Sequence, residues 1–108
     1  MNDLTKTEEM LLICILRLKD EAYGYAIRKY ITQLIGKDFT YGNLYSALSQ
    51  LVKKSYVSKK TGSHDSQNKG KLKIYYAVSP SGINALKASR EVHDILWDGI
   101  NDYVFNNK

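Results

Sequence analysis

Four polar side chains recur at helical spacing in the stretch YGNLYSALSQLVKKSYV, residues 41–57. They fall at i, i+3, i+7 and i+10, so a helix would place them along one side: Asn43, Ser46, Gln50 and Lys53. Their amide and hydroxyl groups donate and accept hydrogen bonds, and this side lacks the Glu–Lys pairs typical of a solvated helix face. We therefore interpret this side of the helix as a binding face.

The opposite side of the same stretch is apolar at a spacing that fits a helix packed on a core. Leucine or valine occurs at i, i+4, i+7 and i+8: Leu44, Leu48, Leu51 and Val52. Thr40 precedes the stretch and is a good N-cap, so the helix should begin there. Gly42 in the first turn lets another backbone, or a phosphate, come close. The pattern predicts an amphipathic helix whose polar side is free to bind.

The net charge of the chain, +5, is concentrated in residues 53–73. Seven lysines against the single acid Asp65 give this segment a charge of +6, and nine basic and ten acidic residues elsewhere give −1. Such a confined basic patch is typical of a protein that binds a polyanion. The alternative is a lysine-rich loop that its charge keeps soluble. The lysines are Lys53, Lys54, Lys59, Lys60, Lys69, Lys71 and Lys73.

Other kinds of chemistry find little support in the sequence. His64 and His93 lack cysteine or acidic partners at the spacing that a metal site needs. Cys14 has no histidine partner in its apolar run, so we interpret it as a buried core thiol. Gly24 and Gly42 stand alone rather than in a glycine-rich phosphate loop. We expect a protein that is not an enzyme and has neither a metal nor a cofactor.

The composition is that of an ordinary globular protein, with 44% hydrophobic and 25% charged residues in a chain of 108. This length allows one domain with a modest core. The longest apolar run, residues 10–16, is far shorter than the roughly 20 residues that span a bilayer. Two glutamates precede the run and it lacks a small-residue cleavage site, so it is not a signal peptide. We expect a cytoplasmic protein with no membrane partner.

Two further helices should precede the polar-faced one. Thr5 and Glu8 form a capping box, which predicts a helix that continues to about residue 18. A second helix is expected over residues 22–35, with Arg28 pointing outward. The core stripe of this second helix should consist of Ile27, Tyr30, Ile31 and Leu34.

A β-hairpin should follow. In KLKIYYAV, residues 71–78, apolar and polar side chains alternate, which is typical of a half-buried strand. The stretch YVSKK, residues 56–60, predicts a weaker partner strand, and residues 61–70 have loop chemistry. Tyr45 and Tyr75 are candidates for phosphate contacts, whereas most of the other tyrosines beside apolar stripes are better explained as packing.

The last predicted element is a long helix over residues 80–104, capped by Ser79 and started by Pro80. At 1.5 Å per residue it would be roughly 37 Å long, too long for a small three-helix body to cover. Its outer half nevertheless carries a broad apolar stripe, so we expect a second copy of the chain to bury it. With the first helix, this helix should form the dimer interface, through Leu12, Val92, Leu96, Ile100 and Tyr103.

Together these elements predict a mainly α fold with a small β-hairpin, a winged helix-turn-helix plus a long C-terminal dimerisation helix. Residues 1–79 would form the DNA-binding domain and residues 80–108 the dimerisation helix and tail. The polar-faced helix would enter the major groove of DNA and contact base edges, with Thr40 and Tyr41 at its start. The seven lysines would meet phosphates. The alternative is a winged-helix module that docks on an acidic protein partner.

The sequence resembles the PadR-like family of transcriptional regulators. The resemblance rests on YGYAIRKYI (23–31), YGNLYSALSQLVKKSYV (41–57) and KIYYAVSPSG (73–82). It implies a small dimeric repressor, joined through its first and last helices, that answers to an aromatic or otherwise toxic small molecule. Two dimer-related copies of the polar-faced helix should read half-sites of an inverted repeat. Family members usually have Thr, Pro, Arg and Glu at Asn43, Ser46, Gln50 and Val52, and glycine at Ser55, so family operators do not transfer.

Trp97 is the single tryptophan and lies one step off the apolar stripe of the terminal helix. Its ring could form a flat wall for an aromatic effector between subunits. Dimer packing is the alternative explanation. The effector-binding residues proposed from the sequence are Trp97, Leu11, Ile15 and His93.

Overall fold

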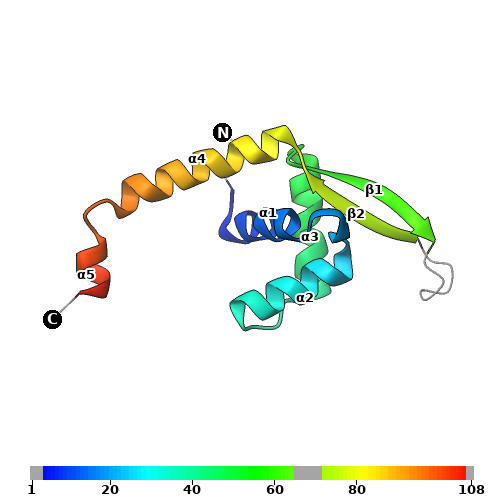
Figure 1. Cartoon of the computed structure of the whole chain (residues 1–108), viewed down its shortest axis with the longest axis horizontal. Coiled ribbons are helices and arrows are strands. Elements are labelled where there is room, and N and C mark those ends of the chain that lie inside the picture. Colours follow the sequence, from blue (N-terminus) through cyan, green and yellow to red (C-terminus); the bar gives the residue numbers. More distant parts are fainter. Residues whose placement is uncertain (1–3, 65–71, 107–108) are drawn as a thin grey trace.

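The protein is described by a computed structural model that covers residues 4–64 and 72–106 (Figure 1). Helix α1, Lys6–Leu18, begins at the predicted capping box. The Thr5 hydroxyl accepts a hydrogen bond from the Glu8 backbone N–H at 3.1 Å, and Glu8 Oε1 accepts one from the Thr5 N–H at 2.9 Å. These reciprocal bonds satisfy two backbone donors that the first turn would otherwise leave open.

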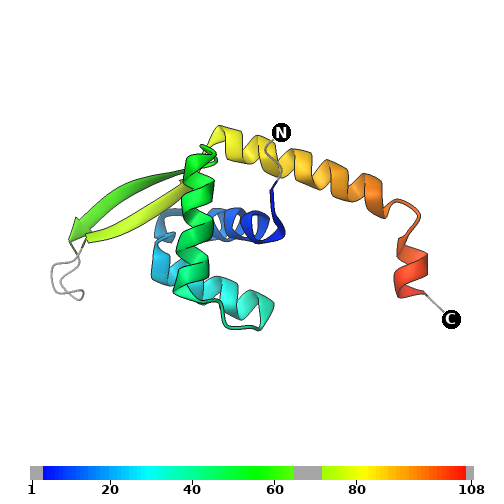
Figure 2. The same ribbon diagram turned by 180° about the vertical axis from the view of Figure 1, so that it is seen from behind.

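Two more helices complete the three-helix body. A short 3₁₀ turn, Lys19–Glu21, leads to α2, Gly24–Ile35, which ends at Gly36 with a left-handed φ of 68°. Helix α3, Tyr41–Lys53, begins as predicted at Thr40, whose hydroxyl accepts from the Asn43 N–H at 3.1 Å. Figure 2 shows α3 lying in front of α1, with the hairpin extending from its upper end.

The hairpin consists of β1, Val57–His64, and β2, Leu72–Val78, paired antiparallel. The prediction ended the first strand at residue 60, but the strand continues to His64. Thr61 pairs with Ile74 and His64 with Leu72, and the register shifts between these two pairs, at Gly62 and Ser63. A Cβ at Gly62 would overlap the Tyr75 ring.

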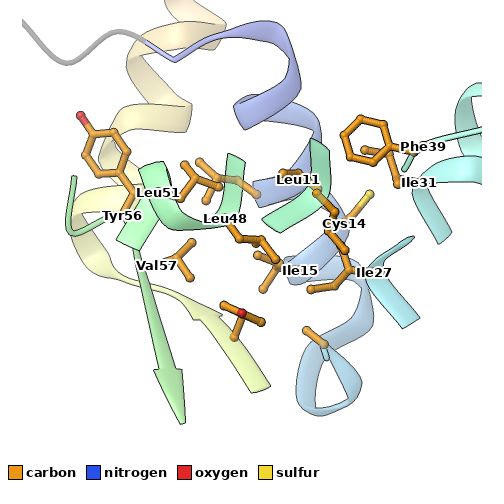
Figure 3. Close-up of a cluster of buried hydrophobic side chains, with 14 residues drawn as sticks. Leu11, Cys14, Ile15, Ile27, Ile31, Phe39, Leu48, Leu51, Tyr56 and Val57 are labelled. Atoms are coloured by element: carbon orange, nitrogen blue, oxygen red, sulfur yellow. The ribbon is translucent and has the colours of Figure 1, made fainter. Parts of the chain in front are cut away.

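The core lies between α1, α2, α3 and the base of the hairpin (Figure 3). Leu44, Leu48 and Leu51 of α3 are 0–1% exposed, so the predicted apolar side of this helix is confirmed. The prediction for α2 was wrong at Leu34, which is 54% exposed. Phe39, from the loop after α2, lies beside Ile31 and closes this end of the core instead.

The terminal helix is not continuous, contrary to the prediction. Helix α4, Pro80–Trp97, is followed by a turn and then by α5, Asn101–Phe105. The chain turns because Asp98 is extended and Gly99 adopts φ +77°, a conformation that costs a side-chain-bearing residue free energy. Beyond the turn, the Phe105 ring stacks on the Trp97 ring with centroids 6.0 Å apart.

We call α4 from residue 92 onward, together with the turn and α5, the arm. Figure 1 shows α4 leaving the three-helix body, so the arm lies away from it. Its apolar side chains are exposed, among them Ile95 at 74%, Leu96 at 68% and Tyr103 at 77%. Within the described residues, no helix is long and apolar enough to cross a membrane.

Candidate nucleic-acid interface

The polar side of α3 faces solvent. Asn43, Ser46 and Gln50 are all exposed, and the leucines at the opposite side are buried. The structure therefore brings these three side chains together on one free surface, next to the exposed Thr40 at the N-cap. The view in Figure 2 looks toward α3 from the side away from α1. We call this surface the α3 face.

The two lysines at the end of α3 have different surroundings. Lys53 is exposed, as a phosphate contact requires. Lys54 points back into the body, and its Nζ lies 2.8 and 2.9 Å from the two carboxylate oxygens of Glu8. The side chain of Glu8 is 5% exposed and that of Lys54 is 23% exposed. Lys54 is thus held in a largely buried ion pair between α3 and α1, which separates it from the other lysines predicted to bind DNA.

This ion pair changes the titration of Glu8. Burial alone would raise the pKa of the carboxyl group, because the charged form loses water. Hydrogen bonds from Lys54 and from the Thr5 backbone outweigh that effect, and the pKa of Glu8 is lowered overall. Glu8 therefore stays ionised at neutral pH and fixes both the start of α1 and the end of α3.

The hairpin lysines lie on two faces of the sheet. Lys59 pairs with Tyr76 and Lys60 with Tyr75, and adjacent residues of a strand point to opposite faces. Both lysines are exposed. The third, Lys73, has its Nζ 4.3 Å from the centre of the Tyr23 ring, a cation–π contact. Lys69 and Lys71 lie outside the described residues.

Aromatic contacts fix the hairpin against α2. The Tyr23 and Tyr75 rings meet edge to face with centroids 5.7 Å apart, and the Tyr76 N–H donates to the Ala22 carbonyl at 2.8 Å. Burial, and then the neighbouring Tyr45, raise the pKa of Tyr76, so its hydroxyl group stays protonated. The orientation of the hairpin relative to α3 is therefore set by packing and not by the strands alone.

Arg28 is a residue of this surface that sequence reasoning missed. It was expected to point outward from α2, but its Nε donates to the Phe39 carbonyl at 2.7 Å. Its guanidinium carbon lies 4.6 Å from the centre of the Tyr41 ring, which in turn stacks on Tyr45 at 6.1 Å. Arg28 is 13 positions before Tyr41, so no helical spacing could indicate this contact.

The predicted effector residues do not all come together. Leu11 and Ile15 are 0% and 2% exposed in the core of the body, and the predicted dimer residue Leu12 is also 0% exposed. Trp97 and His93 do meet, with ring centroids 5.8 Å apart. They border an open cavity of about 560 Å³ between α4 and α5, lined also by Arg90, Asp94, Asp98, Gly99, Asn101 and Phe105.

The described residues hold no group of histidines, cysteines and acids that could bind a metal ion. Cys14 is fully buried. Burial raises its pKa to about 11, so the thiol is protonated at neutral pH and a poor nucleophile. The exposed polar α3 face, flanked by cations, is thus the clearest candidate site of the described chain.

Comparisons with known proteins agree with this geometry. The model of the transcriptional regulator PadR-like family matches residues 12–88. A transcriptional regulator from Clostridium thermocellum, Cth-833, is 26% identical with a TM-score of 0.70, over 90% of this chain and 91% of that one. The protein smu.1704 from Streptococcus mutans UA159 is 27% identical with a TM-score of 0.68, over 90% and 85%.

A PadR family transcription regulator from Clostridium difficile R20291 has the same fold, with a TM-score of 0.66 at 23% identity over 90% of this chain and 97% of that one. A comparison with curated proteins found no match.

Proposed function

Because the chain belongs to the PadR-like family of transcriptional regulators, we propose that it binds double-stranded DNA sequence-specifically, as a homodimeric repressor. The observation that carries this proposal is the α3 face, where exposed hydrogen-bonding side chains replace charged pairs. The major groove of DNA admits an α-helix and presents a distinct pattern of donors and acceptors for each base pair. An uncharged face of short side chains can approach those base edges closely.

Each group of the interface would have its own role. Asn43 and Gln50 carry amides that can pair with adenine edges, and Ser46 can bond to a base or a phosphate. Thr40 and Tyr41 would contact the backbone at the start of α3. Lysines would supply sequence-independent affinity by meeting phosphates. They are the exposed Lys53, Lys59 and Lys60, the half-buried Lys73, and Lys69 and Lys71, which lie outside the described residues. We leave Lys54 out of this set because it is bound to Glu8.

The proposed dimer joins two copies through the arm and α1. Val92, Leu96, Ile100 and Tyr103 are 41–77% exposed, and water-exposed apolar surface of this extent typically marks an interaction site. On α1, Ile13 and Leu16 are exposed and replace the buried Leu12 as candidates. Residues 1–79 would then bind DNA and residues 80–108 would join the copies, so the operator should be an inverted repeat.

The release of repression by a small molecule is also part of the proposal. Trp97, His93 and Phe105 present aromatic rings, and Asp94 and Asp98 lie at the same cavity. Aromatic rings attract planar compounds and carboxylates attract cations. Arg90 lines the cavity too and forms an ion pair with Asp94 at 3.0 Å, so the aromatic rings carry the proposal. We therefore propose that a planar aromatic effector binds in this cavity and releases the dimer from DNA in the cytoplasm.

The α3 face is tested by its selectivity. An operator would first be selected from a library of random duplexes with the wild-type protein. Asn43→Ala and Gln50→Ala should each weaken operator binding by about 1–3 kcal/mol and random-duplex binding little, because a paired base contact is lost. Lys53→Ala is the matched control from the same helix, and it should weaken both duplexes alike.

Unchanged selectivity in both amide variants would exclude the α3 face as the reader of sequence. A wild-type protein that binds no duplex, but binds an acidic protein in a salt-dependent way, would instead support a protein-interaction module.

A further inference from the structure

The contact between Arg28 and the start of α3 puts a cation where the helix itself has none. The first turn of α3 contains neither an acidic nor a basic residue, and its basic residue in the last turn is Lys53. Arg28 comes from α2, but its guanidinium lies over the ring of Tyr41, the first residue of α3. In the loop before α3, Lys37 and Asp38 offset each other in charge.

The guanidinium is held in place on two sides. Its Nε donates to the Phe39 carbonyl at 2.7 Å, and its central carbon lies over the Tyr41 ring, 4.6 Å from the ring centre. The Tyr41 ring is itself stacked on Tyr45, with an angle of 16° between the rings. An arginine has five N–H donors in a rigid fork, so the bond to Phe39 leaves four for another acceptor.

This position lies at the surface and not in the core. Tyr41 is 41% exposed and Tyr45 is 46% exposed, and Arg28 is partly exposed. In helix-turn-helix proteins the N-terminal residues of the recognition helix contact bases while the preceding helix crosses the phosphate backbone. Arg28 is on that preceding helix and beside those N-terminal residues.

We propose that Arg28 binds a phosphate of the DNA strand that borders the N-terminal end of α3, and that Tyr41 positions its guanidinium for this contact. The inference rests on the proposed function, since it names a binding residue within the same interface. Planar, pre-oriented guanidinium groups bind phosphate oxygens in pairs and lose little conformational freedom when they do so. Lys53 would hold the backbone at the other end of the helix.

The test compares two neighbouring cations on α2. Arg28→Gln and Lys29→Gln each remove one positive charge, but Lys29 is exposed and is not part of the contact with Tyr41. The affinity of each variant for a random-sequence duplex is measured over a range of salt concentrations. Arg28→Gln should reduce the slope of log affinity against log salt by about 0.9 per protomer, and Lys29→Gln should leave the slope near the wild-type value.

A purely structural role for Arg28 predicts another result. The bond to Phe39 also fixes the loop before α3, so Arg28→Gln can lower the melting temperature without any change in the salt slope. That outcome overturns the proposal, as does an equal loss of slope in Lys29→Gln. If the wild-type protein binds no duplex at all, the proposed function fails rather than this inference alone.

Substitutions of Tyr41 test the positioning role. Tyr41→Phe keeps the ring that the guanidinium covers and removes no charge, so its salt slope should match the wild type, although the lost hydroxyl contact with the backbone lowers its affinity. Tyr41→Leu removes the ring and should weaken random-duplex binding in a protein that still contains Arg28. Tyr41→Leu should bind more weakly than Tyr41→Phe and with the reduced salt slope of Arg28→Gln. Equal affinity and slope in the two Tyr41 variants would remove the ring from the proposal and assign the effect to the hydroxyl group.

Discussion

Helix α3 and the arm have the same kind of apolar pattern but opposite surroundings. In α3 the leucines at i, i+4 and i+7 are 0–1% exposed, whereas Ile95 and Leu96 in the arm are 74% and 68% exposed. Three other elements enclose the apolar side of α3: α1, α2 and the hairpin. Periodicity therefore locates an apolar face, but the length and path of the chain decide whether other residues of the same chain can cover that face.

A charge in the arm should produce the largest effect. Leu96→Asp would place a carboxylate from each copy in the proposed dimer interface. Burial of such a charge costs several kcal/mol unless it is paired. The protein should then sediment as a monomer. Lys87→Asp, which introduces the same group on the polar side of α4, should remain a dimer. If the wild-type protein is already a compact monomer, the claim that a second copy covers the arm is wrong, because the arm would then be stable without a partner.

Truncation of equivalent leucines separates internal from intermolecular packing. Leu48→Ala should reduce the free energy of unfolding by about 2–5 kcal/mol at every protein concentration, because it opens a cavity in the body. Leu96→Ala removes the same atoms, but its effect should disappear on dilution as the dimer dissociates. Denaturant titrations at high and low protein concentration measure both. A concentration-independent loss in Leu96→Ala would mean that the arm packs on its own body.

The two regions also differ in their ion pairs, which are largely buried in the body and exposed on α4. Lys54→Ala leaves the buried Glu8 carboxylate without its main partner and should cost about 1–3 kcal/mol. Arg90 and Asp94 on α4 are 76% and 59% exposed at 3.0 Å, so Arg90→Ala should cost at most about 0.5 kcal/mol. Thermal unfolding of both variants checks this, and equal losses would show that burial does not govern the strength of these pairs.

The Glu8 pair should also leave a signature in the pH dependence of stability. The folded-state pKa of Glu8 is below its ordinary value of 4.5, so its contribution is present above that value and is lost as the pH falls further. Glu8→Gln lacks this contribution. The difference in unfolding free energy between wild type and Glu8→Gln should therefore be largest near neutral pH and shrink in acid. A constant difference would show that the pair does not titrate in this way.

The smallest effect is expected at two left-handed residues, one in each region. Ser55 has φ 65° after α3, and Ser55→Gly should stabilise the protein by about 1 kcal/mol or less, because glycine relieves the clash of Cβ with the backbone. Gly99→Ala should weaken the turn in the arm by a similar amount. Melting temperatures measure the first change. Helical content by circular dichroism measures the second, since a continuous terminal helix would become more favourable.

Local chemistry could be predicted from the sequence, and distant contacts could not. Thr5, Thr40 and Ser79 all cap helices as expected, because a cap depends on residues three positions away. The partner of Lys54 is 46 residues distant along the chain, and that of Arg28 is 11 residues distant. The apolar spacing around Gly99 favoured an unbroken helix. The stacking of Phe105 on Trp97 that accompanies the break could not be predicted, because it does not follow the helical spacing of the sequence.

The root of α4 is tied to the turn that ends α3. The Ser79 hydroxyl donates to the Ser55 carbonyl at 2.6 Å. At Gly82 the helix lies so close to the Tyr56 carbonyl that a Cβ would overlap it. The 18 residues of α4 extend about 27 Å from this root. In the proposed dimer a tilt of α4 by about 10° at its N-terminal end would therefore move its C-terminal end by about 5 Å. That exceeds the roughly 3.4 Å rise of one base pair, so small angular changes at residues 55–82 would decide which base step each recognition helix meets.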